Sequence, residues 1–171
     1  MSETRHGPMV HARLVPGGEN SGKLVTLVRN QARSVAETRG LPLVIVDGPP
    51  GIGCPVIASL AGADLVLAVT EPTCSGRQDL ERVASLVAHF RIPLAVCVNK
   101  ADLNGEVAAA IEGWCRARGI AGAGRIPYAS EFLDAQEQAR SIVELNGGAG
   151  QAAQAVREVW GRVRVALEDG R

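Results

Sequence analysis

The sequence has 171 residues, about the length of one globular domain and enough to bury a hydrophobic core. Hydrophobic residues make up 46% and charged residues 21%, and 18 basic side chains balance 18 acidic ones. This composition excludes a disordered polar chain and a generally basic nucleic-acid-binding protein. The aromatic content of 3% leaves no stacking platform for single-stranded nucleic acid.

Signals for export or membrane insertion are missing from the sequence. Its apolar runs fall short of the ~18–20 residues needed to cross a bilayer, and residues 1–6 are too polar for a signal peptide. We therefore expect a cytoplasmic protein with no membrane partner and no nucleic-acid partner. The four cysteines, at positions 54, 74, 97 and 115, form no CxxC pair, so we expect buried thiols rather than a metal or redox centre.

Three continuous apolar runs indicate strands that are covered on both faces. They occupy residues 43–46, 65–69 and 94–98. Such runs are typical of the central strands of a mostly parallel sheet with helices on both faces. Residues 121–128 form a weaker, glycine-diluted strand, and residues 9–14 alternate apolar and polar side chains as a half-exposed strand does.

Helix-period segments separate these strands. The spacing predicts helices over residues 24–35 with a stop at Gly40, over 75–87 with a capping box from Ser75 to Gln78, over 107–115 before Gly119, and over 152–167. The alternation predicts a single α/β domain over residues 1–171, of which 1–20 are partly irregular. Ligands are then expected at the carboxyl ends of the strands.

The segment after the first apolar run combines a carboxylate with a stiff, glycine-rich loop. Asp47 directly follows the run and opens the loop Asp-Gly-Pro-Pro-Gly-Ile-Gly. The glycines let the backbone approach a ligand closely, and amides exposed before a helix favour an anion such as phosphate. A carboxylate beside phosphate suggests a nucleotide with Mg²⁺. The alternative is that Asp47 caps a helix or turn and that the prolines fix a connection.

A side-chain amide and a carboxylate follow the run at 94–98. Asn99 and Asp102 belong to the sequence Asn-Lys-Ala-Asp, which places groups that can read a purine edge at a strand end. The pattern NKxD also matches the guanine-reading motif of many GTPases, whereas Asp102 is idle if the base is adenine. The alternative is a turn that leads to a helix capped near Asn104.

A phosphate-loop pattern near the start of the sequence is incomplete. Residues 17–23 satisfy GxxxxGK, but Leu24 stands where the motif needs a serine or threonine hydroxyl for Mg²⁺. We therefore expect Lys23 to lie at a helix start or to offer its charge to a partner or ligand. The histidines, at positions 6, 11 and 89, have no carboxylate or thiol at metal-ligand spacing, so no metal cage is implied.

Four short segments, in order along the chain, resemble the MinD/ParA-type deviant-Walker ATPases. They are residues 47–55 (Asp-Gly-Pro-Pro-Gly-Ile-Gly-Cys-Pro), 70–73 (Thr-Glu-Pro-Thr), 98–100 (Val-Asn-Lys) and 125–128 (Arg-Ile-Pro-Tyr). More narrowly, residues 18–25 are similar to a stretch that follows an inserted ferredoxin-like 4Fe-4S domain in some members. The resemblance extends over residues 7–165 and covers only the part of such proteins after the insert.

This resemblance implies two cofactors, ATP and Mg²⁺, and roles for particular residues. Asp47 matches the switch II aspartate that bonds Mg²⁺-bound water, and Gly51 matches the glycine that senses the γ-phosphate. Asn99 matches the asparagine that contacts the base, with Lys100 beside it, and Pro127 matches a position that lines the base.

The first strand and the KGGxGKT-type phosphate loop of this superfamily have no counterpart in the 171 residues, and neither does the cysteine-rich insert. We therefore expect an incomplete P-loop NTPase-like sheet that binds ATP weakly or not at all. It is not expected to hydrolyse ATP alone, because phosphoryl transfer depends on the missing charge clamp. No iron–sulfur cluster is expected in this chain, since its cysteines lack ferredoxin spacing.

In this superfamily the phosphate-loop strand lies between the strands that match residues 43–46 and 65–69. Its absence predicts a slot ~9–10 Å wide, given the usual strand spacing. A partner chain that supplies the Walker A and ferredoxin segments can fill the slot. Direct pairing of the two flanking strands, or the strand at 9–14, can also close it, and a homodimer partner is the other expected assembly.

Two alternatives belong to other functional classes. One is a non-catalytic α/β interaction scaffold or a truncated relic, in which the Pro-Pro loop serves only the structure. The other is a GTP-reading domain built on Asn99 and Asp102.

Overall fold

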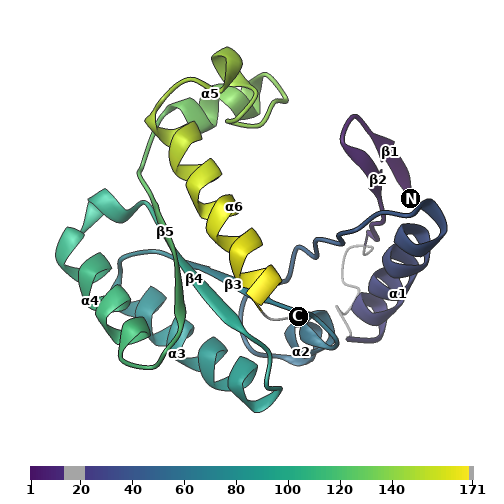
Figure 1. Ribbon diagram of the computed structural model, residues 1–171, viewed down its shortest axis with the longest axis horizontal. Coiled ribbons are helices and arrows are strands. Elements are labelled where there is room, and N and C mark those ends of the chain that lie inside the picture. The colour runs from purple at the N-terminus through teal and green to yellow at the C-terminus, as the bar shows by residue number, and fades with distance from the viewer. Residues whose placement is uncertain (14–21, 170–171) are drawn as a thin grey trace. The chain divides into compact units, whose positions relative to one another are not determined.

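The computed structural model describes residues 1–13 and 22–169, and it divides into two compact units (Figure 1). Unit 1 is Met1–Ala63 and unit 2 is Asp64–Arg171. Whether the two units make up the single domain expected over residues 1–171 stays a prediction. None of the helices in the described ranges is long and apolar enough to cross a membrane.

Unit 2 is built on a three-stranded parallel sheet in the order β3-β4-β5. The strands are β3 (Val66–Thr70), β4 (Leu94–Asn99) and β5 (Ala121–Ile126). They confirm the strands predicted at residues 65–69, 94–98 and 121–128, with boundaries shifted by a residue or two. Residues 95–98 of the middle strand are all buried, as a continuous apolar run requires.

Helices cover both faces of this sheet. The helices of unit 2 are α3 (Cys74–His89), α4 (Gly105–Arg116), α5 (Glu131–Glu137) and α6 (Gln151–Asp169), with short 3-10 turns η1 (Ala101–Leu103) and η2 (Leu145–Gly148). α3 and α4 pack on one face, where Leu80 and Ile111 meet Val96 and Val98. α6 packs on the other face, where Val159 and Val163 meet Ala95, Cys97 and Ala123. The predicted α/β class with helices on both faces is confirmed.

Unit 1 consists of a short hairpin and two helices. β1 (Ser2–Thr4) pairs antiparallel with β2 (Gly7–Met9), and α1 (Gly22–Arg39) precedes α2 (Cys54–Leu60). Two guanidinium groups of α1 cover the end of α2: Arg29 donates to the Ala58 carbonyl at 2.6 Å, and Arg33 donates to the Gly62 carbonyl at 3.4 Å. Both hydrophobic core clusters of the described residues lie in unit 2, so unit 1 has little core of its own.

The strand predicted at residues 43–46 is wrong, because these residues belong to no strand in the described structure. All four side chains are exposed, and Ile45 is 76% exposed. An apolar run predicts a preference for burial, but a strand also needs a neighbour to receive its backbone N–H and C=O groups. In the described structure no strand pairs with residues 43–46. Of the strand expected at 9–14, Met9 ends β2, residues 10–13 belong to no strand, and residue 14 lies outside the described residues.

The helices begin and end close to the residues predicted from the sequence, but the residue that caps α3 is not the predicted one. α3 begins after Thr73, whose hydroxyl accepts a hydrogen bond from the Gly76 N–H at 2.9 Å, so the predicted capping box at Ser75 is wrong. α4 begins after Asn104, whose Oδ1 accepts from the Val107 N–H at 3.1 Å, so the turn and cap given as the alternative for this segment are present. α1 ends one residue before Gly40, which has a φ of 63° as a helix stop requires.

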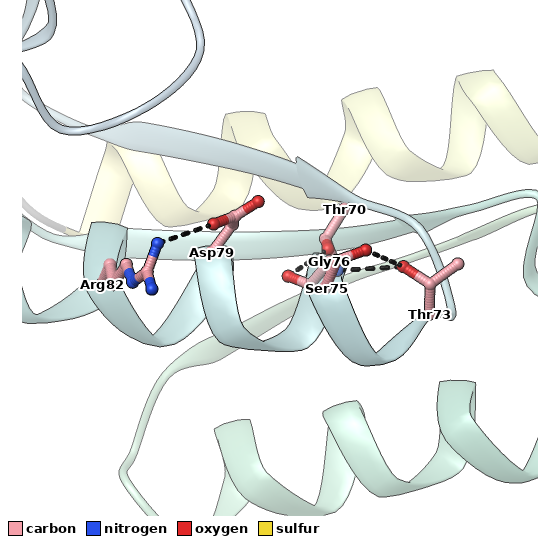
Figure 2. Close-up of polar contacts among 6 residues, drawn as sticks. All are labelled: Thr70, Thr73, Ser75, Gly76, Asp79 and Arg82. Carbon is pink, nitrogen blue, oxygen red and sulfur yellow. Dashed lines mark hydrogen bonds and ion pairs between the residues drawn. The ribbon is translucent and has the colours of Figure 1, made fainter.

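A crowded junction joins β3 to α3 (Figure 2). The Thr70 hydroxyl donates to the Gly76 carbonyl at 2.9 Å, while the Gly76 N–H donates to Thr73, so the first turn of α3 folds back onto the end of β3. A Cβ atom at position 76 would lie 2.5 Å from the Glu71 carbonyl oxygen and 3.0 Å from Thr70 Oγ1. Glycine is therefore required for this approach, and the approach fixes the position of Glu71.

Gly76→Ala is expected to lower the free energy of unfolding of unit 2 by about 1–3 kcal/mol, the usual cost of overpacking. Gly113→Ala is the matched control, because Gly113 also lies within a helix but a Cβ there meets no atom within 4 Å. The control should gain about 0.5–1 kcal/mol from helix propensity. Urea unfolding followed by tryptophan fluorescence reports on unit 2, since Trp114 and Trp160 both belong to it. A Gly76→Ala protein as stable as the parent would contradict the crowded junction.

Candidate functional site

The carboxyl ends of β3, β4 and β5 lie at the same edge of the sheet, because the three strands run parallel. Glu71 follows β3, Asn99 ends β4 with Lys100 next to it, and Pro127 and Tyr128 follow β5. Residues that the sequence predicts on separate segments therefore share one edge. This is the edge at which ligands bind in open parallel sheets.

An ion pair joins the ends of β3 and β4. Lys100 Nζ lies 2.7 Å from Glu71 Oε1, and the two side chains are 39% and 45% exposed. The hydrogen bond and charge of Glu71 raise the pKa of Lys100 above its ordinary value. Lys100 also has left-handed backbone angles, φ 52° and ψ 41°, which a lysine rarely adopts. Exposed ion pairs contribute little stability, so this pair chiefly shows that the turn after β4 lies beside the residue that follows β3.

Asp102 joins the turn after β4 to the loop after β5. Its Oδ1 atom accepts a hydrogen bond from the Tyr128 backbone N–H at 2.6 Å. The sequence analysis missed this contact, because the two residues are 26 positions apart and no local pattern links them. Asp102 therefore has a structural partner, while its role in reading guanine stays a prediction.

Asn99 and Pro127 are half-buried at this edge. Within the described ranges no hydrogen bond engages the side-chain amide of Asn99. An amide offers both a donor and an acceptor. Asn99 can therefore recognise a ligand that presents an acceptor beside a donor, and the two contacts described above hold the loops on either side of it.

Asp47 and Gly51 belong to unit 1, in the segment between residues 43–46 and α2. Both are exposed, and Gly51 has a φ of 94°, which side-chain-bearing residues rarely adopt. Asp47 does not cap the next helix, because Gly53 is the N-cap of α2 and no hydrogen bond reaches Asp47 from the residues the structure describes. Whether Asp47 and Gly51 join Asn99 in one site stays a prediction.

The phosphate-loop pattern falls largely outside the described residues. Residues 17–21 are not among them, whereas Lys23 is exposed in the first turn of α1. The expectation of a helix-start lysine is therefore confirmed for Lys23.

The expectation of buried thiols is confirmed for two cysteines and wrong for the other two. Cys97 and Cys115 are buried, but Cys54 and Cys74 are exposed as the first residues of α2 and α3, where loops meet helices. Burial raises the pKa of the Cys97 thiol to about 11. Cys97 packs on the α6 side of the sheet and Cys115 on the opposite side. Thiols on opposite faces of a sheet cannot bind one cluster, so these residues do not fit an iron–sulfur centre.

Solved structures with the same fold include MinD proteins. The MinD cell division protein of Aquifex aeolicus aligns with a TM-score of 0.66 and 22% identity, over 82% of this chain and 61% of that chain. The Pyrococcus furiosus cell division ATPase MinD aligns with a TM-score of 0.66 and 14% identity, over 85% of this chain and 59% of that one. The MinC:MinD cell division protein complex of Aquifex aeolicus aligns with a TM-score of 0.65 and 22% identity, over 82% of this chain and 59% of that chain. The chain has a MinD-like P-loop fold.

Sequence relatives cover a shorter part of the chain. Uncharacterized protein MJ0578 of Methanocaldococcus jannaschii is 33% identical over 97 residues, which are 57% of this chain and 34% of that protein. Uncharacterized protein MJ0579 of the same organism is 36% identical over 93 residues, 51% of this chain and 33% of that protein. No family model matches the sequence. The matched regions thus span about a third of the length of these relatives.

Asp102→Ala is expected to release the loop after β5, because the Tyr128 N–H loses its charged acceptor. Hydrogen exchange at the Tyr128 amide, followed by NMR, should become about tenfold faster as local opening becomes easier. Asp79→Ala is the matched control, since Asp79 is an exposed carboxylate with only a 3.4 Å ion pair to Arg82. It should leave the exchange of Tyr128 unchanged. Unaltered exchange in Asp102→Ala would show that the 2.6 Å contact does not hold the loop.

Proposed function

We propose that this chain is the part of a MinD-like nucleotide-binding unit that contacts the base and holds Mg²⁺. The phosphate-binding Walker A segment then comes from polypeptide outside these 171 residues. The observation that carries the proposal is the sheet edge of unit 2, where the half-buried Asn99 amide has no partner among the described residues and lies between two fixed loops. In this proposal units 1 and 2 make up one α/β domain with the added segment.

Asn99 contacts adenine in this proposal. Adenine presents an acceptor beside an amino donor, and an asparagine amide can bond both. Pro127 lines the base with its apolar ring, and the pair of Lys100 with Glu71 lies next to Asn99 at the end of β4. Adenine is favoured over guanine because one of the two carboxylate oxygens of Asp102, the residue a guanine reader uses as acceptor, already accepts from the Tyr128 N–H.

Asp47 binds Mg²⁺ through a water molecule in this proposal, and Gly51 places its amide against the γ-phosphate. An exposed carboxylate with no hydrogen bond from the described residues fits the first role, and a glycine φ of 94° fits the second. Mg²⁺, when bound, neutralises charge on the phosphate oxygens. The chain does not hydrolyse ATP alone, because it contributes neither the Walker A lysine nor the hydroxyl that completes the clamp.

One partner in this proposal is a chain or segment that supplies Walker A and also carries the ferredoxin-like module. The other partner is a second copy of the nucleotide-binding unit so completed. We place the iron–sulfur cluster in that module, because the cysteines of this chain lack ferredoxin spacing and Cys97 and Cys115 lie on opposite faces of the sheet. The protein acts in the cytoplasm.

Isothermal titration tests the proposal with Mg-ATP and the full chain, with and without a defined Walker A segment. That segment joins a five-residue Val/Ile strand, the loop Lys-Gly-Gly-Xaa-Gly-Lys-Thr and an amphipathic helix. We expect the segment to tighten Mg-ATP binding at least about tenfold, equivalent to about 1.4 kcal/mol. ATP should then bind more tightly than GTP.

Asp47→Asn should remove most of this gain when Mg²⁺ is present and change little without it. Asp64→Asn is the matched control, because Asp64 is also an exposed carboxylate but precedes the amino end of β3. Equal affinity with and without the segment would contradict complementation. An Asp47→Asn protein that binds as the parent does would favour the non-catalytic scaffold.

A further inference from the structure

A cavity lies at the side of the sheet, between β5 and α4. Its volume is about 190 Å³, which is room for about six water molecules at ~30 Å³ each. β5 runs between α4 and α6 (Figure 1), and both helices contribute to the lining. All the lining residues belong to unit 2, so the geometry of the cavity does not depend on unit 1. The cavity lies beside the middle of β5, away from the carboxyl ends that form the candidate site.

Glycines of β5 leave this space unfilled. Gly122 is in register with Val96, whose side chain packs into the core formed with α3 and α4, so position 122 faces α4. A Cβ atom at Gly122 would meet no atom within 4 Å. Gly124 has a φ of 124°, a conformation open mainly to glycine, and the register between β4 and β5 shifts beside it. The strand therefore provides no side chain where its neighbour α4 leaves room for one.

The floor of the cavity is apolar. Val96 and Val98 of β4 are 4% and 1% exposed, and Ile120 packs against the same core cluster. The Cys115 thiol also lines the cavity. Burial, and then the charge of Glu112, raise the pKa of Cys115 above its ordinary value, so the thiol carries no charge at neutral pH. A ligand on this floor therefore gains free energy by covering aliphatic side chains.

The rim of the cavity carries positive charge. The Arg116 guanidinium of α4 makes no hydrogen bond or ion pair with the residues that the structure describes. Arg162 of α6 donates to the Ala123 carbonyl at 3.3 Å, which engages one of the five N–H groups of its guanidinium. The acidic residue at the rim, Glu112, already pairs with Arg125 at 2.6 Å. Arg116 and Arg162 therefore line the cavity without a carboxylate partner from the described part of the chain.

The pKa of Glu112 reflects how close these charges lie to one another. The hydrogen bonds of Arg125 lower this pKa most, and the charges of Arg125, Arg116 and Arg162 lower it further, against the opposing effect of burial. All three guanidinium groups thus lie near one carboxylate. A second carboxylate placed beside Arg116 and Arg162 would be attracted in the same way and would accept charge-assisted hydrogen bonds.

We propose that this cavity is a binding site for a small, branched aliphatic carboxylate. The carboxylate group pairs with Arg116 and Arg162, and the hydrocarbon part covers Val96, Val98 and Ile120. An inorganic anion fits less well, because it covers none of the apolar floor. A large ligand fits less well too, since pockets for drug-sized molecules have volumes of ~300–1,000 Å³. The site goes beyond the proposed nucleotide-binding role and does not rest on it.

NMR titration of the full chain with isovalerate tests the proposal, with the amides of Cys115, Gly122 and Gly124 as reporters. We expect these amides to shift saturably, with a dissociation constant in the millimolar range because so small a ligand has few atoms to contribute. Isovaleramide has the same shape without the charge, and inorganic phosphate has charge without the hydrocarbon. Each should bind at least about tenfold more weakly than isovalerate. Equal binding of the three probes at one ionic strength, or shifts that do not saturate, would overturn the proposal.

Gly122→Val should abolish isovalerate binding, because its side chain fills the cavity at a position where a Cβ meets no atom. Valine also suits a strand, so the fold should be retained. Gly113→Ala is the matched control, since it too adds a side chain in open space but does not line the cavity. Slow hydrogen exchange at the buried Ile111 amide verifies that both variants remain folded. A Gly122→Val protein that binds isovalerate as the parent does would overturn the proposal.

Arg116→Gln should weaken isovalerate binding at least about tenfold and leave the weak binding of isovaleramide unchanged, because only the charged probe loses an ion pair. Arg164→Gln is the matched control. Arg164 is an exposed arginine of α6 that does not line the cavity, and its guanidinium has a 3.9 Å pair with Glu168. The control should bind both probes as the parent does. Undiminished isovalerate binding by Arg116→Gln would overturn the proposal.

Discussion

The parallel alignment of β3, β4 and β5 is the constraint on which the candidate site depends. Parallel strands must return by helices, so the sheet of unit 2 is covered on one face by α3 and α4 and on the other by α6. The same alignment gathers the carboxyl ends of all three strands at one edge. Polar residues cannot enter the buried run at 95–98, so they follow the strands instead. Glu71, Asn99 and Pro127 therefore share an edge although no local pattern connects them.

Two of the three apolar runs form strands, and only the run at 94–98 is a central strand of the described sheet. Residues 65–69 and 94–98 became β3 and β4, because each run has a neighbouring strand and a helix to cover it. Residues 43–46 have the same pattern but form no strand, because no strand of the described structure pairs with them. The pattern of side chains predicts where a segment prefers to lie. Only the rest of the sheet determines whether its backbone is paired.

The ends of the strands could be predicted from the sequence, but the contacts between residues that follow different strands could not. Asn99 and Lys100 could be predicted as edge residues, because they follow an apolar run, whereas Pro127 was expected at the site only from the family resemblance. The hydrogen bond from Tyr128 to Asp102 and the left-handed turn at Lys100 could not, because both depend on how distant strands align. The cap at Thr73 had a local signal, since threonine before a helix is a common N-cap. The exposure of Leu67 and Val69 could not be predicted, because every residue of the run at 65–69 is apolar.

The phosphate dependence of nucleotide affinity tests the central claim most directly. Adenosine and Mg-ATP would each be titrated into the chain alone, with the amides of Asn99, Lys100 and Tyr128 observed by NMR. If the chain contacts the base but contains no phosphate cradle, the two ligands should shift the same amides and bind with dissociation constants within about threefold, since less than about 1 kcal/mol separates them. Mg-ATP that binds a hundredfold more tightly than adenosine would contradict the account, because a working phosphate site would then lie within these 171 residues.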